Sequence, residues 1–272
     1  MKNYRKFQDR RNPKYSSSKI LNPKNTSWSP VSFWYDDYLE TDKDSYQEKV
    51  IAPNLTRIIS PQKGLKILDL ACGQGFFSRK FSDLGADVVG SDISKELISI
   101  AKKNSPHLKF CIAPADKLFF AKDESFDVVV MVLAIQNIDN MLEVCTEVRR
   151  TLVPGGKFII VINHPTFRVP KRSSWGYDEE NRIQYRRIDE YMSESKTEIK
   201  MHPGEKPTEV TVSFHRPLQV YFKSLKKAGL AVTGLEEWIS NKKSESGPRK
   251  LIEDKARKEI PLFMMLECRV TP

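Results

Sequence analysis

The chain has few cysteines and lacks long apolar runs, and both features exclude classes of protein. Four cysteines are widely spaced over the 272 residues, and form neither a disulfide framework nor a CxxC metal motif: Cys72, Cys111, Cys145 and Cys268. No apolar segment approaches the roughly 18–20 residues that span a bilayer. The basic N-terminus is not followed by the apolar core of a secretory signal. We therefore expect a reduced, cytoplasmic protein without a membrane partner.

The sequence also lacks a complete dinucleotide-binding fingerprint. Residues 66–81 read KILDLACGQGFFSRKF, in which Gly73 and Gly75 separate an apolar run from a helical pattern. The third glycine of GxGxxG is missing, because Ser78 occupies that position. Asp69, four residues before Gly73, is not part of that fingerprint and suits a ligand that carries a cation. The four histidines are scattered, so we expect no metal site.

The positive charge is concentrated at the N-terminus. Residues 1–30 contain eight basic residues and one acid, Asp9, so +7 of the net charge of +10 falls there and only +3 on the rest. Residues 1–27 have little to bury, and one interpretation is a basic flexible tail. The other is an electrostatic arm for RNA or another anion.

Strand-like and helix-like patterns alternate from Lys66 onward. The strand patterns are apolar on both faces, as expected where helices cover both sides of a parallel sheet. Pro53 is expected to kink or divide the helix before them, and Ser94 to cap a later one. We predict an α/β fold with seven strands, at residues 66–71, 86–92, 108–114, 126–134, 157–164, 230–238 and 260–270.

Two segments depart from this alternation. Residues 165–212 are polar, aromatic and basic without a clear period, and we interpret them as a lid inserted after the fifth strand. Residues 240–257 form a charged excursion between the last two strands. Both lie within a single predicted domain, residues 28–272.

The acid at the end of the second strand completes a ligand-binding pattern. Asp92 lies 17 residues after Gly75, where a carboxylate can accept hydrogen bonds from both hydroxyls of a ribose. Asp69, Gly73, Gly75 and Asp92 each fall at an element boundary. With ILDLACGQG, VVGSDIS and LVPGGKFIIVINHP, they make residues 28–270 resemble the class I S-adenosylmethionine-dependent methyltransferases, specifically the type 11 group, with Ala71 replacing the first motif glycine.

The resemblance implies a Rossmann-like fold, S-adenosylmethionine as cofactor and a set of cofactor-binding residues. The family often has an aspartate that binds the adenine where this chain has Pro114. The roles of Ala115 and Asp116 are therefore assigned only from their positions after the third strand. The implied residues are Asp69 and Ala71 in the turn; Gly73 and Gly75 under the methionine part; Asp92 at the ribose; Ile93 against the adenine; Ala115 and Asp116 at the adenine amine; and Ala134, Ile135 and Gln136 facing the methionine end.

Candidate residues for the methyl acceptor come from less specific signals. His164 ends the fifth strand and is the first candidate for a general base, the alternative being a structural, hydrogen-bonded histidine. Asn137, after the fourth strand, faces the same crevice. Arginines and aromatic rings of the lid can bind a flat, anionic substrate, or can be a solvated surface. The candidate substrate-binding residues are Tyr35, Gln136, Arg168, Trp175, Arg186 and His215.

The leading functional hypothesis is methyl transfer to a small acceptor, anionic or aromatic, by in-line displacement. An RNA methyltransferase that uses the basic tail and the lid is the alternative. A non-catalytic S-adenosylmethionine-binding protein is a third reading. The sequence does not specify the oligomeric state.

Overall fold

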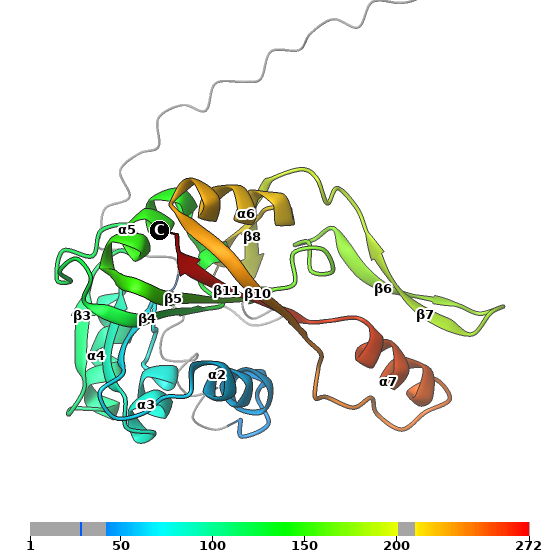
Figure 1. Ribbon diagram of the computed structural model, residues 1–272. Coiled ribbons are helices and arrows are strands. Elements are labelled where there is room, and N and C mark those ends of the chain that lie inside the picture. Colours follow the sequence, from blue (N-terminus) through cyan, green and yellow to red (C-terminus); the bar gives the residue numbers. More distant parts are fainter. Residues whose placement is uncertain (1–27, 29–41, 201–209, 272) are drawn as a thin grey trace, which may run out of the picture.

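The computed structural model describes residue 28 and residues 42–200 and 210–271. Its centre is a seven-stranded sheet with the order β10-β11-β5-β4-β1-β2-β3, in which β11 runs antiparallel to the others (Figure 1). The strands are β1 (Lys66–Leu70), β2 (Asp87–Asp92), β3 (Lys109–Ile112), β4 (Phe126–Val132), β5 (Leu152–Asn163), β10 (Leu230–Trp238) and β11 (Phe263–Val270). The predicted mostly parallel, Rossmann-like sheet is confirmed.

The helices also follow the sequence signals. Pro53 lies in the first turn of α2 and is preceded by a π-helical segment, so it does divide the helical stretch. The Ser94 side chain accepts a hydrogen bond from Leu97 N and caps α4. None of the helices in the described ranges is long and apolar enough to cross a membrane. The helices are η1 (Gln47–Ile51), α2 (Ala52–Ile59), α3 (Phe76–Asp83), α4 (Lys95–Asn104), η2 (Ile135–Asn137), α5 (Met141–Thr151), α6 (Leu218–Lys227) and α7 (Lys250–Glu259).

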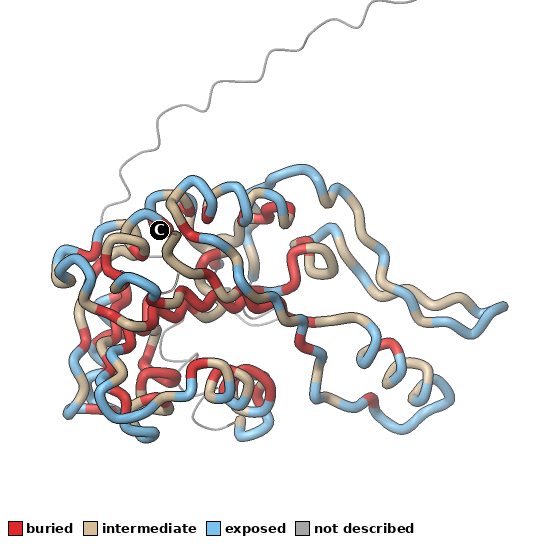
Figure 2. Tube along the Cα trace, viewed as in Figure 1, coloured by how far each residue is buried: buried red, intermediate tan, exposed pale blue. Residues whose placement is uncertain are grey.

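The sheet has an apolar core on each face. Along β5, Ile160 and Ile162 pack with α5 and α6, whereas Ile159 and Val161 pack with α2 and α3. The alternation follows from the period of two in a strand, and it explains why β5 is apolar without interruption. Figure 2 shows the buried residues concentrated along the sheet and under these helices.

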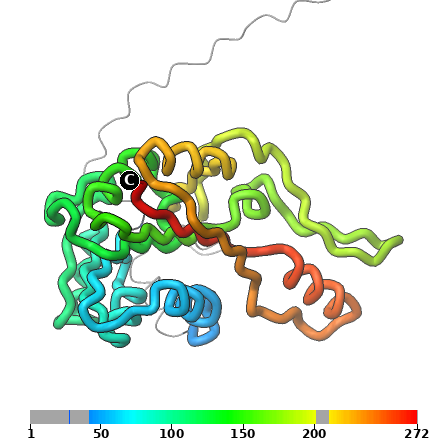
Figure 3. The backbone as a smooth tube through the Cα atoms, viewed as in Figure 1, coloured from blue at the N-terminus to red at the C-terminus, as the bar shows by residue number. Residues whose placement is uncertain are grey.

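Residues 165–212 form β-structure that the sequence analysis did not predict. They contain the hairpin β6 (Ser173–Asp178) and β7 (Ile183–Ile188), the strand β8 (Ser195–Lys200) and the start of β9 (Val210–His215), which pairs with β8. Figure 3 shows the β6–β7 hairpin and α7 extending together away from the sheet. The Arg249 guanidinium joins them, 4.1 Å from the Tyr177 ring centroid and paired with Glu179. The charged excursion therefore contains a helix that packs beside part of the insertion.

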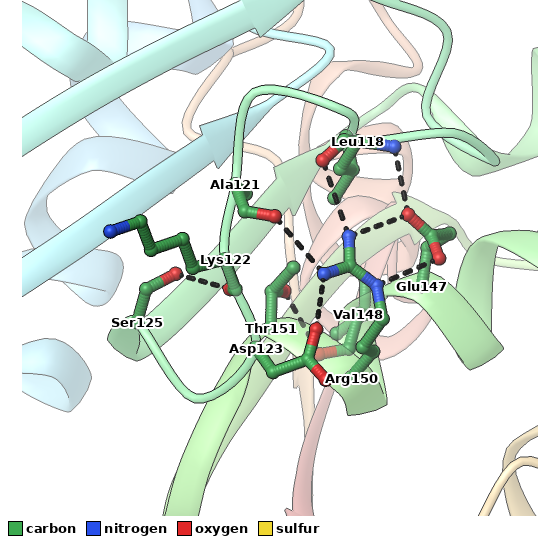
Figure 4. A network of polar contacts seen from close by, with 9 residues as sticks. All are labelled: Leu118, Ala121, Lys122, Asp123, Ser125, Glu147, Val148, Arg150 and Thr151. Carbon is green, nitrogen blue, oxygen red and sulfur yellow. Dashed lines mark hydrogen bonds and ion pairs between the residues drawn. The ribbon is translucent and has the colours of Figure 1, made fainter.

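One arginine anchors the long connection between β3 and β4. Arg150, on α5, donates to the carbonyls of Ala121 (3.0 Å) and Leu118 (3.2 Å) and pairs with Asp123 and Glu147 (Figure 4). Glu147 also accepts a hydrogen bond from Leu118 N, and Arg150 holds the pKa of this carboxyl below its ordinary value. This network fixes the part of the connection that leads into β4. The first residues of the same connection follow β3 at the carboxyl ends of the parallel strands.

Candidate active site

A cavity of about 640 Å³ opens at the carboxyl ends of β1, β2, β3 and β4. Its position is the crevice where open α/β sheets bind ligands, and its size is that of a cofactor pocket. The described lining residues come from β1, the turn after it and the start of α3 (Asp69, Ala71 to Gln74, Phe76, Phe77), from the end of β2 to α4 (Asp92, Ile93, Leu97), from after β3 (Ala113 to Asp116), from the end of β4 and beyond (Val132 to Ala134, Asn137 to Asn140), from the β8–β9 pair (Lys196, Val212, Phe214) and from Trp28.

The turn between β1 and α3 requires glycine for two physical reasons. Gly73 and Gly75 have positive φ values of 56° and 84°, which side chains disfavour. A Cβ atom on Gly75 would also lie only 2.9 Å from Cζ of Phe110. Ala71 has a φ of 57° in the same turn, so it adopts a glycine-like conformation without being glycine.

Replacing Ala71 by glycine is expected to stabilise the protein. Relief of the left-handed conformation contributes about 1–2 kcal/mol, and the greater freedom of glycine in the unfolded chain offsets about 0.4–1 kcal/mol of it. Thermal unfolding should therefore show a Tm increase of roughly 2 °C. Ala113→Gly is the matched control, because Ala113 lines the same cavity with an ordinary φ. A Tm lowered equally by both substitutions would contradict the strain at Ala71.

Asp69 is a buried carboxyl group in the lining of the cavity. Only 1% of its surface is exposed, and its Oδ2 accepts a hydrogen bond from Ser78 Oγ at 2.6 Å. Burial raises its pKa to about 7, against the opposing hydrogen bond, and the neighbouring Asp92 adds to the increase. The residue that breaks the GxGxxG pattern thus orients this acid, a pairing that the sequence analysis missed.

Asp92 joins the glycine turn to the start of α4. Its Oδ2 accepts from Gly73 N at 3.0 Å, and its Oδ1 accepts from Ser94 N at 2.8 Å. Burial raises the pKa of Asp92, and these backbone donors oppose the increase. The two carboxylate oxygens together offer about four acceptor sites, so Asp92 can still accept a hydrogen bond from a ligand in the cavity.

The segments after β3 and β4 form adjoining walls. Asn140 Nδ2 donates to Asp116 Oδ2 at 3.1 Å and links the two walls. Asn137 lines the cavity, and its Nδ2 donates to the carbonyl of Leu133 at 3.3 Å. Leu133 has a φ of 52°, unusual for a bulky residue, so the cavity contains strained backbone at the ends of both β1 and β4. Ala115, Ala134 and Ile93 also line the cavity.

The β8–β9 pair supplies a wall that the sequence analysis did not predict. Lys196, Val212 and Phe214 line the cavity from this side, and we call these three residues the β8–β9 wall. Arg216, immediately after β9, is buried and donates to the carbonyls of Ile135 (3.3 Å), Ile138 (2.7 Å) and Asp139 (2.8 Å). The strict alternation of Val210 to His215 was a strand signal that could have revealed this wall.

His164 does not line this cavity. It is 4% exposed, its Nε2 lies 2.7 Å from Glu237 Oε1, and its Nδ1 accepts a hydrogen bond from Thr166 N. Burial lowers its pKa, while Glu237 opposes that change. Both ring nitrogens have partners, which is the geometry of the structural alternative rather than of a base poised toward the cavity.

The predicted lid residues also lie away from the described cavity lining. Trp175 and Arg186 face each other across β6–β7, with the guanidinium 5.3 Å from the ring centroid. Arg186 also donates to the carbonyl of Phe167 at 2.9 Å. Arg168 is partly buried, and burial and Arg186 together lower its pKa. Trp175 and Arg186 stabilise the hairpin. The role of all three side chains toward an acceptor stays a prediction.

Five further predicted residues are not among the described lining residues. One of them, Gly75, is the N-cap of α3 and follows the lining residue Gln74. Ile135 is fully buried in the core on the α5–α6 face, and Gln136 beside it has a buried Oε1 without a hydrogen-bond partner. His215 is buried, and its Nε2 donates to the carbonyl of Tyr191 at 2.7 Å. Tyr35 lies outside the described residues.

Comparisons with known proteins agree with this architecture. Residues 68–160 match the family model described as "Methyltransferase domain". The chain is 35% identical to a demethylmenaquinone methyltransferase of Renibacterium salmoninarum over 105 residues. This aligned segment covers 38% of this chain and 44% of that protein. A ubiquinone biosynthesis O-methyltransferase of Roseobacter denitrificans is 34% identical over 100 residues, or 35% of this chain and 40% of that protein. The chain thus spans about half the length of the curated relatives it matches.

Solved structures extend the similarity beyond that segment. An S-adenosylmethionine-dependent methyltransferase from Mesorhizobium loti superposes with a TM-score of 0.63 at 27% identity, over 80% of this chain and 96% of the other. A Listeria monocytogenes structure at 23% identity, with a TM-score of 0.62 over 82% and 100% of the two chains, shares the fold. The family match over residues 68–160, these structures and the acid–glycine–acid arrangement agree: the chain is similar to S-adenosylmethionine-dependent methyltransferases and shares their fold.

Proposed function

We propose that the chain binds S-adenosylmethionine in this cavity and catalyses transfer of its methyl group to a small-molecule acceptor. The observation that carries the proposal is the convergence of Asp69, the Gly73–Gly75 turn and Asp92 on one cavity at the strand ends. The same arrangement was predicted from the sequence, and the family match covers all of these residues.

The polar atoms of the cavity fit the cofactor. Gln74 lines the cavity, and its Nε2 is a buried donor without a hydrogen-bond partner, available to a carboxylate of the ligand. Asp92 offers acceptors for ribose hydroxyls, and Asp69 offers negative charge to a cationic ligand. The donor, the acceptors and the charge match the carboxylate, the hydroxyls and the cationic groups of S-adenosylmethionine.

The chemistry needs little from the side chains beyond binding and orientation. When bound, the cofactor supplies a methyl group on a positively charged sulfur, which is already a good leaving group. The apolar walls, including Ile93, Leu133 and Phe214, exclude water and can orient a nucleophile. A general base is required only for an acceptor that arrives protonated, and the contacts of His164 do not favour that role.

The names of the relatives do not identify the methyl acceptor of this chain. Those names concern menaquinone and ubiquinone biosynthesis, but the family match ends at residue 160, before the β8–β9 wall. We therefore propose a small-molecule acceptor, with a quinone precursor as one member of that class. No observation on the described residues favours the RNA or the non-catalytic alternative.

A ligand panel tests the proposal directly. In thermal-shift measurements, S-adenosylmethionine and S-adenosylhomocysteine should raise the Tm, because they bind the native state alone, whereas NAD and RNA should not. Calorimetry should then give one S-adenosylmethionine site per chain. A folded protein that binds NAD or RNA, and neither of the two cofactor forms, would overturn the proposed function.

A further inference from the structure

The charged residues of the cavity are unevenly distributed. Its described lining includes four acids and a single base: Asp69, Asp92, Asp116, Asp139 and Lys196. Asp69 and Asp92 adjoin the glycine turn, whereas Lys196 belongs to the β8–β9 wall. An acidic end suits a cationic methyl donor, and a basic group on another wall suits a ligand of the opposite charge.

Lys196 places its positive charge beside an aromatic ring. It is exposed on β8, directly opposite Phe214 on β9, and its Nζ lies 5.5 Å from the centroid of that ring. Within the described ranges, no carboxylate forms an ion pair with it. The ring contact orients the ammonium group and leaves its hydrogen-bond donors available.

A second cation strengthens the positive character of this wall. The Arg216 guanidinium lies 5.1 Å from the centroid of the Phe214 ring and is 5% exposed. Arg216 donates hydrogen bonds to backbone carbonyls of the segment after β4, which carry no net charge. Phe214 therefore lies beside two positive charges. Among residues 42–200 and 210–271, no carboxylate forms an ion pair with the buried Arg216, so its charge is not neutralised there.

We propose that the β8–β9 wall recognises an acidic group of the methyl acceptor, a carboxylate or an ionised phenol or enol, through the ammonium of Lys196. This inference rests on the proposed function and specifies its substrate class. Phe214 provides an apolar surface for the body of the acceptor, and Arg216 holds the adjoining segment at Ile135 to Asp139. The acceptor's charge is thus bound by Lys196 rather than by Arg168, which lies outside the described lining.

The test compares two probes that differ in charge. Benzoate and benzyl alcohol are titrated, with calorimetric or ligand-observed NMR detection, into protein saturated with S-adenosylhomocysteine. The wild type should bind benzoate more tightly, and Lys196→Met should lose that preference by about fivefold in Kd, the effect of one solvent-accessible charge pair. Lys200→Met is the matched control, because Lys200 is exposed on the same face of β8 but outside the described cavity lining.

The outcomes separate this inference from the proposed function. S-adenosylhomocysteine should bind the wild type and Lys196→Met equally, and its failure to bind the wild type would count against the proposed function instead. Equal or undetectable binding of the two probes to the wild type overturns the acidic acceptor. A preference for benzoate that survives in Lys196→Met, or that disappears equally in Lys200→Met, overturns the role of Lys196.

Discussion

Replacing Asp92 by alanine is expected to lower the affinity for S-adenosylmethionine by roughly tenfold to a hundredfold. The carboxylate offers lone pairs to two ribose hydroxyls, and hydrogen bonds to a charged acceptor contribute about 1.5–3 kcal/mol. The substitution also removes the acceptor of Gly73 N and so loosens the turn beneath the cofactor. Both effects act in the same direction, and calorimetry on the folded variant measures their sum.

The control must separate affinity from stability, because Asp92 also receives the hydrogen bond of Ser94 N. Ser94→Ala removes the cap of α4 and should cost about 1 kcal/mol of stability while leaving the Asp92 carboxylate in place. We therefore expect a lower Tm for both variants and a large loss of affinity for Asp92→Ala alone. Unchanged binding to folded Asp92→Ala would refute the ribose site.

Most of the fold could be predicted because its signals are local. All seven sheet strands were expected from apolar runs between turn residues, Ser94 caps α4 as predicted, and Pro53 divides the helical stretch before β1. The β6–β7 hairpin was missed because neither of its faces is buried in the core, so it has no apolar pattern to detect. It is stabilised instead by cross-strand pairs such as Trp175 and Arg186, which only the pairing register brings together.

The cofactor side of the site could be predicted from local signals, whereas the acceptor side could not. The cofactor residues follow β1, β2, β3 and β4 directly, so their positions in sequence predict their positions in space. The acceptor side depends on contacts between distant segments: His164 pairs with Glu237, 73 residues away, and Arg216 reaches Ile138, 78 residues away. The sequence alone does not show which of these distant segments reaches the cavity. Arg168, near the end of β5, was therefore a reasonable candidate for binding the acceptor's charge, but the cavity lining contains Lys196 instead.

The affinity for S-adenosylmethionine is expected to fall by up to tenfold per pH unit below about pH 7. Burial raises the pKa of Asp69 to about 7 in the free protein. A cationic ligand stabilises the ionised carboxylate and lowers its pKa in the complex, so binding at lower pH must expel a proton. The affinity should therefore rise with pH up to about 7 and level off above it.

The same pKa determines how Asp69 affects folding. Because the folded-state value lies above that of the unfolded chain, this group favours the native state below the unfolded pKa of about 3.8 and loses that contribution as the pH rises through 7. Asp69→Asn keeps an acceptor for Ser78 Oγ but cannot ionise. The variant should consequently have a higher Tm than the wild type at about pH 8, where wild-type Asp69 is charged and buried.

Calorimetric titrations from about pH 5.5 to about pH 8.5, in two buffers of different ionisation enthalpy, measure the protons released on binding. The wild type should release up to one proton below pH 7, and Asp69→Asn should bind more weakly with a flatter pH profile. An equal slope in both proteins would assign the proton to another group, first of all to Asp92, whose pKa burial also raises. Because Asp92→Ala retains Asp69, its pH profile distinguishes the two carboxyls: the step should persist there, moved to lower pH by the loss of the Asp92 charge, and be absent from Asp69→Asn.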